Sequence, residues 1–428
     1  MELMPGYKRS DVGVIPDDWD CLRACEFGFF KGGSGFPLWA QGQRTGEYPF
    51  FKVSDMNNEG NETFMTAANH YVSEQTRKHL GAQAFPADSI VFAKVGAAVF
   101  LERKKILGQP SCIDNNMAAY VLDASRADVR FVHSLLLMKK LGALVATTAL
   151  PALNGKQLAE MVLALPPLPE QRVIAAALSD VDALLATLDQ VIAKKRDLKQ
   201  AAMQQLLTGK IRLPGFGGEW EAKKLEHAGC CLRGVSYRGD DDLSPHDTAF
   251  TKRLLRSNNV QNAFVVTDDV QFVNNKRVSQ DQVLQKNDIL ICMANGSKAL
   301  VGKAGLFSID DGFDYTFGAF MGCFRTDASI ADPVFVFSLF QTGRYRDYIN
   351  NLLAGSSINN LSPSSIDSLE FSFPPYAEQV AIGRALAEMD AELSVLEYRR
   401  DKTHNLKQAM MQELLTGKTR LVEGGYDG

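Results

Sequence analysis

The sequence predicts a mixed α/β (α+β) protein in which two related globular domains are joined by two long antiparallel coiled-coil helices with pseudo-two-fold symmetry. Three observations predict this fold: a long segment that occurs twice, an apolar seam of helical period inside each copy, and weaker matches between the segments that precede the copies. With 428 residues, of which 46% are hydrophobic and 22% charged, the chain is long enough for two or three domains with buried cores.

The repeated segment is the strongest of these observations. Residues 166–213 and 374–421 align without a gap at an offset of 208, and 25 of the 48 positions are identical. The best match is LKQAAMQQLLTGKIRL against LKQAMMQELLTGKTRL, at residues 198–213 and 406–421. Chance similarity between two helices does not produce such a match, so the chain contains an internal duplication.

Both copies carry the start and stop signals of one long helix. Each opens with two prolines, at 166–167 and 374–375, and continues with Glu-Gln three residues after the second proline. Prolines before a helix and an acidic residue in its first turn mark a helix start. Near the other end, Gly209 and Gly417 fit the left-handed position that stops a helix. Each copy therefore predicts a helix of roughly 40 residues, about 60 Å long.

The apolar residues inside each copy step by four and three, which is the period of a coiled-coil seam. An ordinary core helix shows a similar stripe, but the length and the duplication favour two equal helices that bury their seams against each other. The seam then becomes polar: Ile192 is matched by Arg400, and Lys195 by Thr403. One half of each helix is therefore expected to pack less tightly or to face something else. The seam residues are Ile174, Leu178, Val181, Leu185, Leu188 and Ile192 in the first copy, and Ile382, Leu386, Met389, Leu393 and Leu396 in the second.

The segments before the two helices correspond more weakly. Trp19 matches Trp220, and three stretches pair in order: 50–57 with 254–261, 88–100 with 288–300, and 153–167 with 361–375. They alternate apolar with polar residues and break at glycines and Asp/Asn turns, which predicts short strands with loops and a few helical stretches such as 130–147. The expected organisation is a first domain at 1–155, a central long helix within 156–213, a second domain at 214–363 and a distal long helix within 364–428.

Several classes of protein are disfavoured by what the sequence lacks. Seven cysteines form no CxxC or Cys/His cluster of metal-ligand spacing, so we expect reduced thiols in a cytoplasmic protein and no metal site. No apolar run reaches the roughly 18 residues that span a bilayer. The opening MELMPGYKRSDVG also lacks the layout of a signal peptide.

Two motifs resemble catalytic or nucleotide-binding sequences without matching them. In FPPY (373–376) the leading position of an amino-methyltransferase tetrapeptide, which must be Asp, Asn or Ser, holds Phe373, so a helix start explains the motif better. GGSG (32–35) lacks the GxxxxGK[ST] and GxGxxG patterns, and a flexible surface loop is expected there, with phosphate or groove contact as the minority alternative. We therefore predict no catalytic residue and no bound cofactor.

The chain resembles the specificity subunits of type I restriction–modification systems over essentially its whole length. LPPLPEQ with the long helix ending in LLTGKIRL is similar to the family's central region, and FPPYAEQ with LLTGKTRL is similar to its distal copy. YKRSDVGVIPDDW resembles the amino-terminal lead, and FFKVSDMN and DSIVFAKVGAAVF resemble elements of the family's target recognition domains. The duplicated LLTGK-type helix ending is the most specific of these motifs.

The resemblance implies a two-headed reader of double-stranded DNA that is not itself an enzyme. Each recognition domain would contact one half of a split, asymmetric target, and the paired helices would space the domains and dock two methyltransferase subunits. Those subunits would bind S-adenosylmethionine and methylate adenine, and a further restriction/translocase subunit would use ATP. Readers about 60 Å apart would be separated by more than one turn of B-DNA, about 34 Å, so both could reach major grooves on one side.

Candidate DNA-contacting residues are polar side chains at matching positions of the two domains. Specificity is expected from Arg or Lys to guanine and Asn or Gln to adenine, with phosphate contacts that set the register. For any single residue a solvated surface side chain remains the alternative. The candidates are Lys31, Ser34, Arg44, Lys52, Ser54, Asp55, Asn57 and Lys94 in the first domain, and Arg233, Tyr237, Arg238, Arg256, Ser257, Asn258, Asn259, Asn295, Ser297 and Lys298 in the second.

The net charge of −4 argues mildly against DNA binding, because phosphate neutralisation needs positive charge. Local positive charge or a partner would have to supply it. Two alternatives to a DNA-specificity subunit differ in what they require. A single-chain methyltransferase or nuclease would need a cofactor loop and a working tetrapeptide, and this chain has room for neither. A coiled-coil scaffold with protein-binding heads, which the acidic balance permits, would show no salt-dependent DNA affinity.

Overall fold

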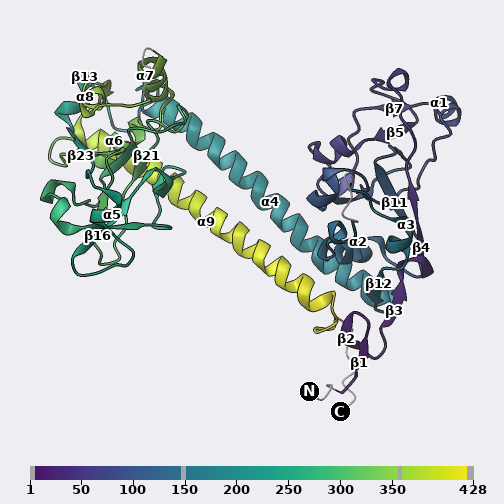
Figure 1. Ribbon diagram of the computed structural model, residues 1–428. Helices are drawn as coiled ribbons and strands as arrows, with labels where there is room; N and C mark the ends of the chain where they lie inside the picture. Colours follow the sequence, from purple (N-terminus) through teal and green to yellow (C-terminus); the bar gives the residue numbers. More distant parts are fainter. Residues whose placement is uncertain (1–4, 146–150, 355–358, 422–428) are drawn as a thin grey trace. The chain divides into compact units, whose positions relative to one another are not determined.

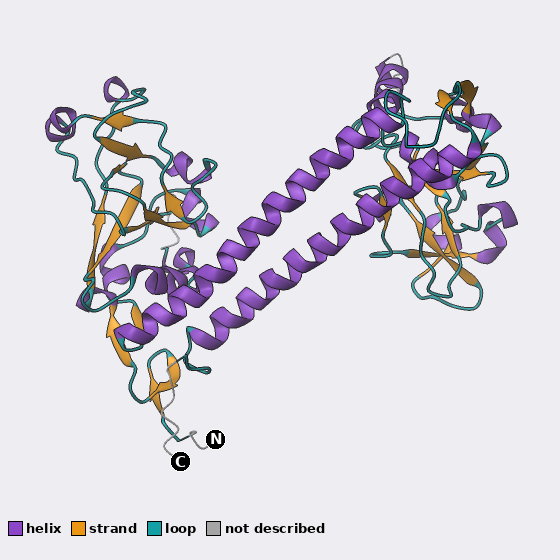
Figure 2. Cartoon of the chain, turned by 180° about the vertical axis from the view of Figure 1, so that it is seen from behind, coloured by secondary structure: helices purple, strands orange, loops and turns teal. Residues whose placement is uncertain are grey.

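The computed structural model describes residues 5–145, 151–354 and 359–421. It divides into two compact units, which we call unit 1 (residues 1–188 and 399–428) and unit 2 (residues 189–398). Two 39-residue helices, α4 (Leu168–Leu206) and α9 (Tyr376–Leu414), each contribute a part to both units (Figure 1). Figure 2 shows the strands gathered in the globular part of each unit, from which the long helices extend.

Unit 1 contains a five-stranded sheet in the order β4-β11-β8-β9-β6 and a three-stranded sheet in the order β10-β5-β7. A separate hairpin, β1–β2, lies at the amino-terminal end, and β3 pairs with β12 beside the start of α4. The strands are β1 (Tyr7–Ser10), β2 (Gly13–Pro16), β3 (Asp20–Arg23), β4 (Gly28–Gly32), β5 (Tyr48–Phe51), β6 (Phe64–Met65), β7 (Tyr71–Val72), β8 (Ile90–Ala93), β9 (Lys104–Leu107), β10 (Cys112–Ile113), β11 (Met117–Leu122) and β12 (Val162–Leu165), and the short helices are α1 (Glu74–His79), α2 (Val129–Met138) and α3 (Gly155–Ala159).

Unit 2 repeats the two sheets and the strand pair at the helix start with small additions, and its described residues include no counterpart of the β1–β2 hairpin. Its larger sheet has the order β14-β23-β20-β21-β18-β17, its smaller sheet the order β15-β19-β16-β22, and β13 pairs with β24 beside the start of α9. The strands are β13 (Glu221–Lys224), β14 (Gly229–Arg233), β15 (Leu243–Ser244), β16 (Thr251–Leu255), β17 (Val260–Gln261), β18 (Phe264–Val265), β19 (Gln271–Asn274), β20 (Ile289–Cys292), β21 (Ala304–Leu306), β22 (Tyr315–Phe317), β23 (Met321–Thr326) and β24 (Glu370–Phe373), and the short helices are α5 (Gly239–Asp242), α6 (Pro333–Leu339), α7 (Gly343–Ala354) and α8 (Pro363–Asp367).

The matched strands confirm that the two globular parts are related. The parallel pair β5/β10 in unit 1 corresponds to the parallel pair β16/β22 in unit 2, and the antiparallel β8/β11 corresponds to β20/β23. The stretches that align in the sequence occupy these equivalent places: 88–100 contains β8, and 288–300 contains β20. One expected element is shorter than predicted. Helix α2 ends at Met138 because Lys139 has extended backbone angles, and residues 146–147 of the expected 130–147 stretch lie outside the described residues.

The long helices begin and end where their sequence signals predict. Both start at the residue after the double proline, and Gly209 and Gly417 follow the helix ends with φ values of +68° and +72°, in the left-handed region. Within the expected segments 156–213 and 364–428 the helices occupy 168–206 and 376–414, and the residues before them form α3, β12, α8 and β24.

In each unit the segments of α4 and α9 run antiparallel and bury the predicted seam. Ile174 and Leu178 are buried in unit 1, and Ile382 and Leu386 in unit 2. An ion pair joins Lys407 to Asp182 in unit 1, and its counterpart at an offset of 208 joins Lys199 to Asp390 in unit 2. The same contact therefore recurs with the roles of the two helices exchanged, as pseudo-two-fold symmetry requires.

The expectation of a looser polar half is wrong at one of the three polar positions that suggested it. Thr403 is 8% exposed, whereas Lys195 and Arg400 are half-buried. Thr403 donates its hydroxyl proton to the carbonyl of Arg399 (2.8 Å), so its polar atom is satisfied within the helix. Lys195 reaches Glu392 at 2.7 Å. Polar residues are thus tolerated in the seam where their side chains form a hydrogen bond or an ion pair.

A buried glutamate near the start of each long helix binds an arginine that follows the other helix, and we call this arrangement the clamp. In unit 1 the carboxylate of Glu170, whose side chain is 1% exposed, binds the guanidinium of Arg420 at 2.7 and 2.8 Å. Glu170 also accepts a hydrogen bond from the indole Nε1 of Trp19 (3.1 Å), and Arg420 makes a second bidentate contact with Asp18 (2.9 and 2.8 Å). These hydrogen bonds hold the pKa of Asp18 below its ordinary value, with Arg420 as the main cause.

Unit 2 has the equivalent clamp between Glu378 and Arg212. The arginine binds the carbonyl of Gly218 (2.8 Å) in place of a second carboxylate, and among the described residues the buried Nε1 of Trp220 has no hydrogen-bond partner. In both units the glutamine after the glutamate ties the helix start to the globular part. Gln171 accepts from the backbone N–H of Asp128 (2.8 Å), and Gln379 accepts from that of Asp332 (3.1 Å).

Replacement of the clamp arginine should destabilise the protein strongly. Arg420→Ala leaves the carboxylate of Glu170 buried without its cation, and breaking a buried pair in this way costs about 3–5 kcal/mol. Lys195→Ala removes the exposed pair with Glu392 and should change the free energy of unfolding by less than about 1 kcal/mol. Urea unfolding followed by tryptophan fluorescence measures both changes. Equal effects of the two substitutions would contradict the assignment of the clamp.

Candidate nucleic-acid interface

An open cleft of about 1140 Å³ lies on unit 2 where segments from its two sheets meet. It is lined by the residues after β14, by the turn after β16, by the residues after β20 and by the turn between β22 and β23. The backbones approach closely beneath it: a Cβ on Gly234 would lie 2.0 Å from the carbonyl oxygen of Gly318. Glycine is therefore required at this crossing, and the polar side chains lie on the turns above it.

The cleft contains an arginine held by an acidic partner. Arg256 places its guanidinium 2.9 Å from the carboxylate of Asp269, and Asn258 donates to the same carboxylate oxygen at 3.2 Å. Asn295 lies 3.5 Å from the hydroxyl of Ser257, and the hydroxyl of Tyr237 lies 3.4 Å from Gln271. With Asn359 and Ser236, which also line it, the cleft gathers a planar cation, three amides and three hydroxyls, which are groups that read base edges by hydrogen bonding.

The structure brings five of the predicted residues of the second domain together in this cleft, and places the other five outside its lining. Arg233, Arg238, Ser297 and Lys298 are exposed on neighbouring segments, and the ammonium of Lys298 lies 3.4 Å from the carbonyl of Leu353. The five residues in the lining are Tyr237, Arg256, Ser257, Asn258 and Asn295.

Asn259 does not have the surface role expected of it. Its side chain is 0% exposed, accepts from the backbone N–H of Arg256 (2.9 Å) and donates to the carbonyls of Val266 (3.1 Å) and Asp268 (2.7 Å). The oxygen and the nitrogen of its amide are therefore both engaged in hydrogen bonds inside the protein. It holds the turn that presents Arg256 and cannot itself reach a ligand.

The lining residues of the cleft that were not predicted include Phe320, Asp269 and Asn359. Phe320 is 72% exposed on the turn between β22 and β23, and Asp269 anchors Arg256 from a loop after β18. The sequence signal for Phe320 was an aromatic residue in the short turn GAFM between two apolar strands. Asp269 gave no local signal, because its contact with Arg256 depends on how two separate loops pack.

Unit 1 carries the equivalent arrangement with different side chains. Lys52 precedes the turn after β5, as Arg256 does after β16, and its ammonium reaches Gln41 at 3.2 Å. Ser34 forms an isolated parallel β-bridge with Asp114, which lies on the segment before β11. The backbone N–H of Lys94 donates to the carbonyl of Asn116 (2.8 Å). Asp114 and Asn116 were not predicted, although they occupy the places of Gly318 and Phe320.

The acid at this place in unit 1 has a shifted pKa. Burial raises the pKa of Asp114 above its ordinary value, and the opposing effects of hydrogen bonds from Asn116 and of the Lys52 cation are smaller. The nearby Gly33 is in close contact with the backbone, since a Cβ there would lie 2.1 Å from the carbonyl oxygen of Asp114. The GGSG stretch is therefore a packed crossing of two segments, which corrects the expected flexible loop.

The remaining predicted residues of unit 1 are more dispersed. Lys31 is exposed on β4, Arg44 is exposed in the loop before β5, Ser54 is exposed, and Asn57 accepts a hydrogen bond from Arg103. Asp55 is the counterpart of Asn259 and is equally unable to reach a ligand. It is 0% exposed and accepts from the backbone N–H of Lys52 (2.6 Å) and from Asn69 (2.5 Å).

Other sequence alternatives can be compared with the structure. Phe373 is buried on β24 and α9 begins at Tyr376, which confirms FPPY as a helix start. Among the residues that the structure describes, no cluster of His, Cys, Asp and Glu could hold a metal ion. Within the same residues, no helix is both long enough and apolar enough to cross a bilayer.

The family of the chain follows from comparison with known proteins. A family model described as the type I restriction modification DNA specificity domain matches residues 16–194 and again residues 220–402. The chain belongs to this specificity-subunit family. The two matches coincide with the two halves of the duplication, so each half is one copy of the family's domain.

Related proteins and structures agree with this assignment. The specificity subunit of the type I restriction enzyme StySPI of Salmonella potsdam is 30% identical over 202 residues, which are 46% of this chain and 43% of that protein. That of EcoKI of Escherichia coli (strain K12) is 30% identical over 198 residues, 46% of this chain and 42% of that protein. These matches span less than half the length of either relative. The putative MjaX specificity subunit of Methanocaldococcus jannaschii is 21% identical over 436 residues and 97% of both chains.

One solved structure shows that the fold extends over the whole chain. The crystal structure of a type I restriction–modification system S subunit from M. genitalium has a TM-score of 0.61, at 13% identity, over 97% of this chain and 98% of that chain. The mixed α/β fold with paired long helices is therefore the fold of an S subunit.

The buried asparagine and its exposed neighbour should differ in their effect on stability. Asn259→Ala leaves buried backbone groups of the loop without partners, and each such group costs about 1–3 kcal/mol. Asn258→Ala changes an exposed side chain and should alter the free energy of unfolding by less than about 0.5 kcal/mol. Thermal unfolding of the two variants makes the comparison. A larger loss for Asn258→Ala would show that the structural role is assigned to the wrong residue.

Proposed function

We propose that this specificity subunit reads a bipartite, asymmetric DNA target, one half with each globular part, for a type I restriction–modification complex. The observation that carries the proposal is the cleft of unit 2 together with the equivalent turns of unit 1, which carry different side chains on the same backbone frame. Unit 2 presents Arg256 and Phe320 where unit 1 presents Lys52 and Asn116. Two readers with the same backbone and different donors, acceptors and apolar groups suit two different base sequences.

The chemistry of the unit 2 cleft supports direct reading of base edges. The guanidinium of Arg256 can bind guanine O6 and N7 with two hydrogen bonds, and the amides of Asn258 and Asn295 can bind adenine. The exposed ring of Phe320 supplies an apolar contact for a thymine methyl group or a base step. Asp269 holds Arg256 in place before DNA arrives, which reduces the entropy lost on binding.

The long helices support the docking of two methyltransferase subunits. Each helix exposes large apolar side chains outside the buried seam, including the matched pair Leu198 and Leu406. Exposed apolar stripes on paired helices are surfaces for partner helices. The partners would supply the S-adenosylmethionine site for adenine methylation, a further restriction/translocase subunit would supply ATP use, and this chain would contribute no catalytic residue. They would also supply positive charge, because this chain has a net charge of −4.

A methylation map of the host DNA tests the proposed function as a whole. The chain is co-expressed with its methyltransferase subunit, and N6-methyladenine is mapped with and without it. We expect one split motif that depends on this chain. Exchange of residues 221–373, from β13 to β24, for the same segment of a related subunit should change one half of the motif and leave the other unchanged. A stable complex whose methylation has no motif would favour the protein-binding scaffold instead.

Substitutions in the cleft of unit 2 and at the equivalent turn of unit 1 should act on separate halves of the target. Arg256→Ala should weaken discrimination at a position in one half-site by about 1–3 kcal/mol, because a bidentate contact is lost. Lys52→Ala should act on the other half-site alone. Lys223→Ala, on the exposed strand β13, serves as the control. Competition binding of the complex to DNA with single base changes measures each effect. If both cleft variants altered the same half-site, the assignment of one cleft to each half would be wrong.

A further inference from the structure

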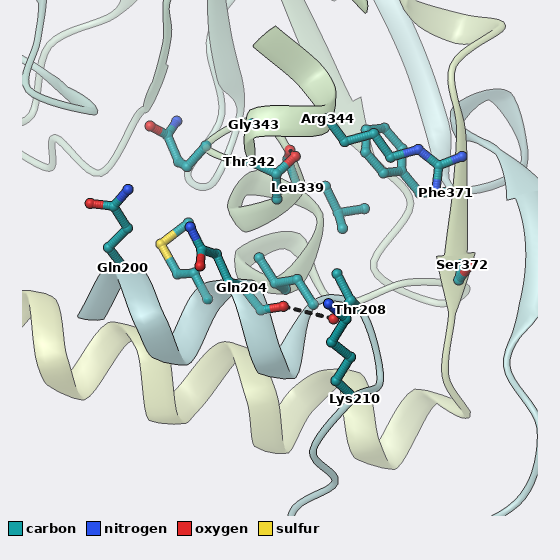
Figure 3. A pocket seen from close by; sticks show the side chains of 13 residues that line it. Gln200, Gln204, Thr208, Lys210, Leu339, Thr342, Gly343, Arg344, Phe371 and Ser372 are labelled. Atoms are coloured by element: carbon teal, nitrogen blue, oxygen red, sulfur yellow. Dashed lines mark hydrogen bonds between the residues drawn. The ribbon is translucent and has the colours of Figure 1, made fainter. Parts of the chain in front are cut away.

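Unit 2 contains a groove of about 450 Å³ beside the last turns of α4, away from the candidate DNA-reading cleft (Figure 3). One wall is formed by α4 and Lys210, another by the segment from Leu339 to Arg344 that joins α6 to α7, and a third by β24. In Figure 3 the side chains of Gln200 and Gln204 rise from α4 toward the α6–α7 segment.

Unit 1 contains the matching groove, reduced to about 180 Å³. Leu415 and Thr416 after α9 stand where Leu207 and Thr208 stand after α4, and Leu163 on β12 stands where Phe371 stands on β24. The two grooves are therefore the same feature of the duplicated fold. What differs is that the groove of unit 1 has additional lining residues, which come from the β1–β2 hairpin.

The hairpin covers the end of α9 in unit 1. Val12, Val14 and Ile15 line the groove, and the hydroxyl of Tyr7 donates to the carbonyl of Gly417 (3.0 Å). Gly417 is buried under the hairpin: a Cβ there would lie 2.5 Å from Cδ of Pro16. At the equivalent Gly209 of unit 2 the nearest atoms to such a Cβ belong to Trp220, at 3.4 Å. The end of α4 thus lacks the cover that the end of α9 has.

The chain cannot supply a second hairpin of the same kind from the equivalent position. Residues 207–220 connect α4 to β13, and they contain no strand. The described residues therefore hold two matching grooves and one hairpin, which lines the groove of unit 1. A segment that covered the groove of unit 2 in the same way would come from another molecule.

We propose that the groove of unit 2 binds an extended segment of a partner protein, and that this partner is one of the two methyltransferase subunits. The identity of the partner rests on the proposed function. Met203, Leu207 and Leu339 offer an apolar floor for β-branched side chains like those of the hairpin. The amides of Gln200 and Gln204 are placed at the groove to bind the backbone of an extended segment.

The rim of the groove adds a charge preference. Lys210 and Arg344 line it, and within the described part of the chain neither forms a salt bridge, while Arg344 lies 5.6 Å from the centre of the Phe371 ring. The segment that binds therefore carries an acidic residue next to its aliphatic ones. Because the hairpin lines and narrows the matching groove of unit 1, the two methyltransferase subunits dock differently: one makes this contact and the other does not.

Site-specific crosslinking at two matched positions tests the proposal. The photo-reactive residue p-benzoylphenylalanine replaces Thr208 in one variant and Thr416 in another, in the full chain co-expressed with the methyltransferase. Both threonines donate to a carbonyl four residues earlier in their own helix, so the two substitutions remove the same local bond. We expect Thr208 variants to crosslink to the methyltransferase and Thr416 variants to crosslink within the chain, to residues 7–16.

A charge reversal at the rim provides a second measurement. Arg344→Glu should reduce the crosslink from position 208 severalfold, and Lys140→Glu, on the segment after α2 that corresponds to the α6–α7 segment, should leave it unchanged. A synthetic peptide of residues 6–18 should compete with the crosslink, since it carries the side chains that fill the groove of unit 1.

Three results would overturn the proposal. A complex that methylates a split motif but gives no crosslink from position 208 would remove the groove contact and leave the proposed function intact. A crosslink to a second copy of this chain would identify self-association in place of the partner. Failure of the methyltransferase to bind this chain at all would remove both the groove contact and the proposed docking of that subunit.

Discussion

The fold of each unit depends on a buried carboxylate near the start of one long helix. This carboxylate pairs with an arginine that follows the other long helix. Glu170 begins one long helix and receives Arg420 from the segment after the other helix, and Glu378 receives Arg212 in the same way. A buried charge is tolerated only if it is paired and hydrogen-bonded, so the start of one helix can be buried only when the end of the other is present. This condition forces the two helices to run antiparallel in each unit and fixes their register.

The clamp also fixes the globular part to the helices. Trp19 donates to the same carboxylate, and Gln171 binds the backbone at the start of α2. The base of each unit is therefore held by buried polar contacts, whereas Arg256 and Phe320 stand on turns above the backbone crossing. Unit 2 has Arg256 and Phe320 where unit 1 has Lys52 and Asn116. The glycines at the backbone crossing below these turns are not disturbed by this difference. A rigid base with variable turns is what a reader of changeable sequence requires.

The sequence predicted most of the fold because the duplication supplies an internal comparison. The prolines, the glycines and the apolar seam located both helices to within a few residues, and identical Glu, Arg, Asp and Lys positions in the repeat were an unused signal for the clamp and the inter-helix ion pairs. The cleft was predicted less well. Asp55 and Asn259 are polar and occupy matching positions, which predicts a DNA contact, but each is matched because it caps a buried turn. Asp269 and Asp114 join the clefts through contacts between distant loops, which no local pattern encodes.

The two units differ in the segment before the matched tryptophan, and there unit 1 has contacts that unit 2 lacks. In unit 1 the segment before Trp19 is a hairpin that covers the helix end, and Asp18 gives Arg420 a second carboxylate. In unit 2 the segment before Trp220 must connect α4 to β13, so it cannot fold back in the same way, and Arg212 binds a backbone carbonyl in place of that carboxylate. The exposed groove and the weaker set of contacts around Trp220 thus have one cause, which is that the second copy of the domain follows a helix. When a duplicated domain is joined in a single chain, its two junctions differ, and in the described residues the difference leaves the groove of unit 2 without the hairpin that lines the groove of unit 1.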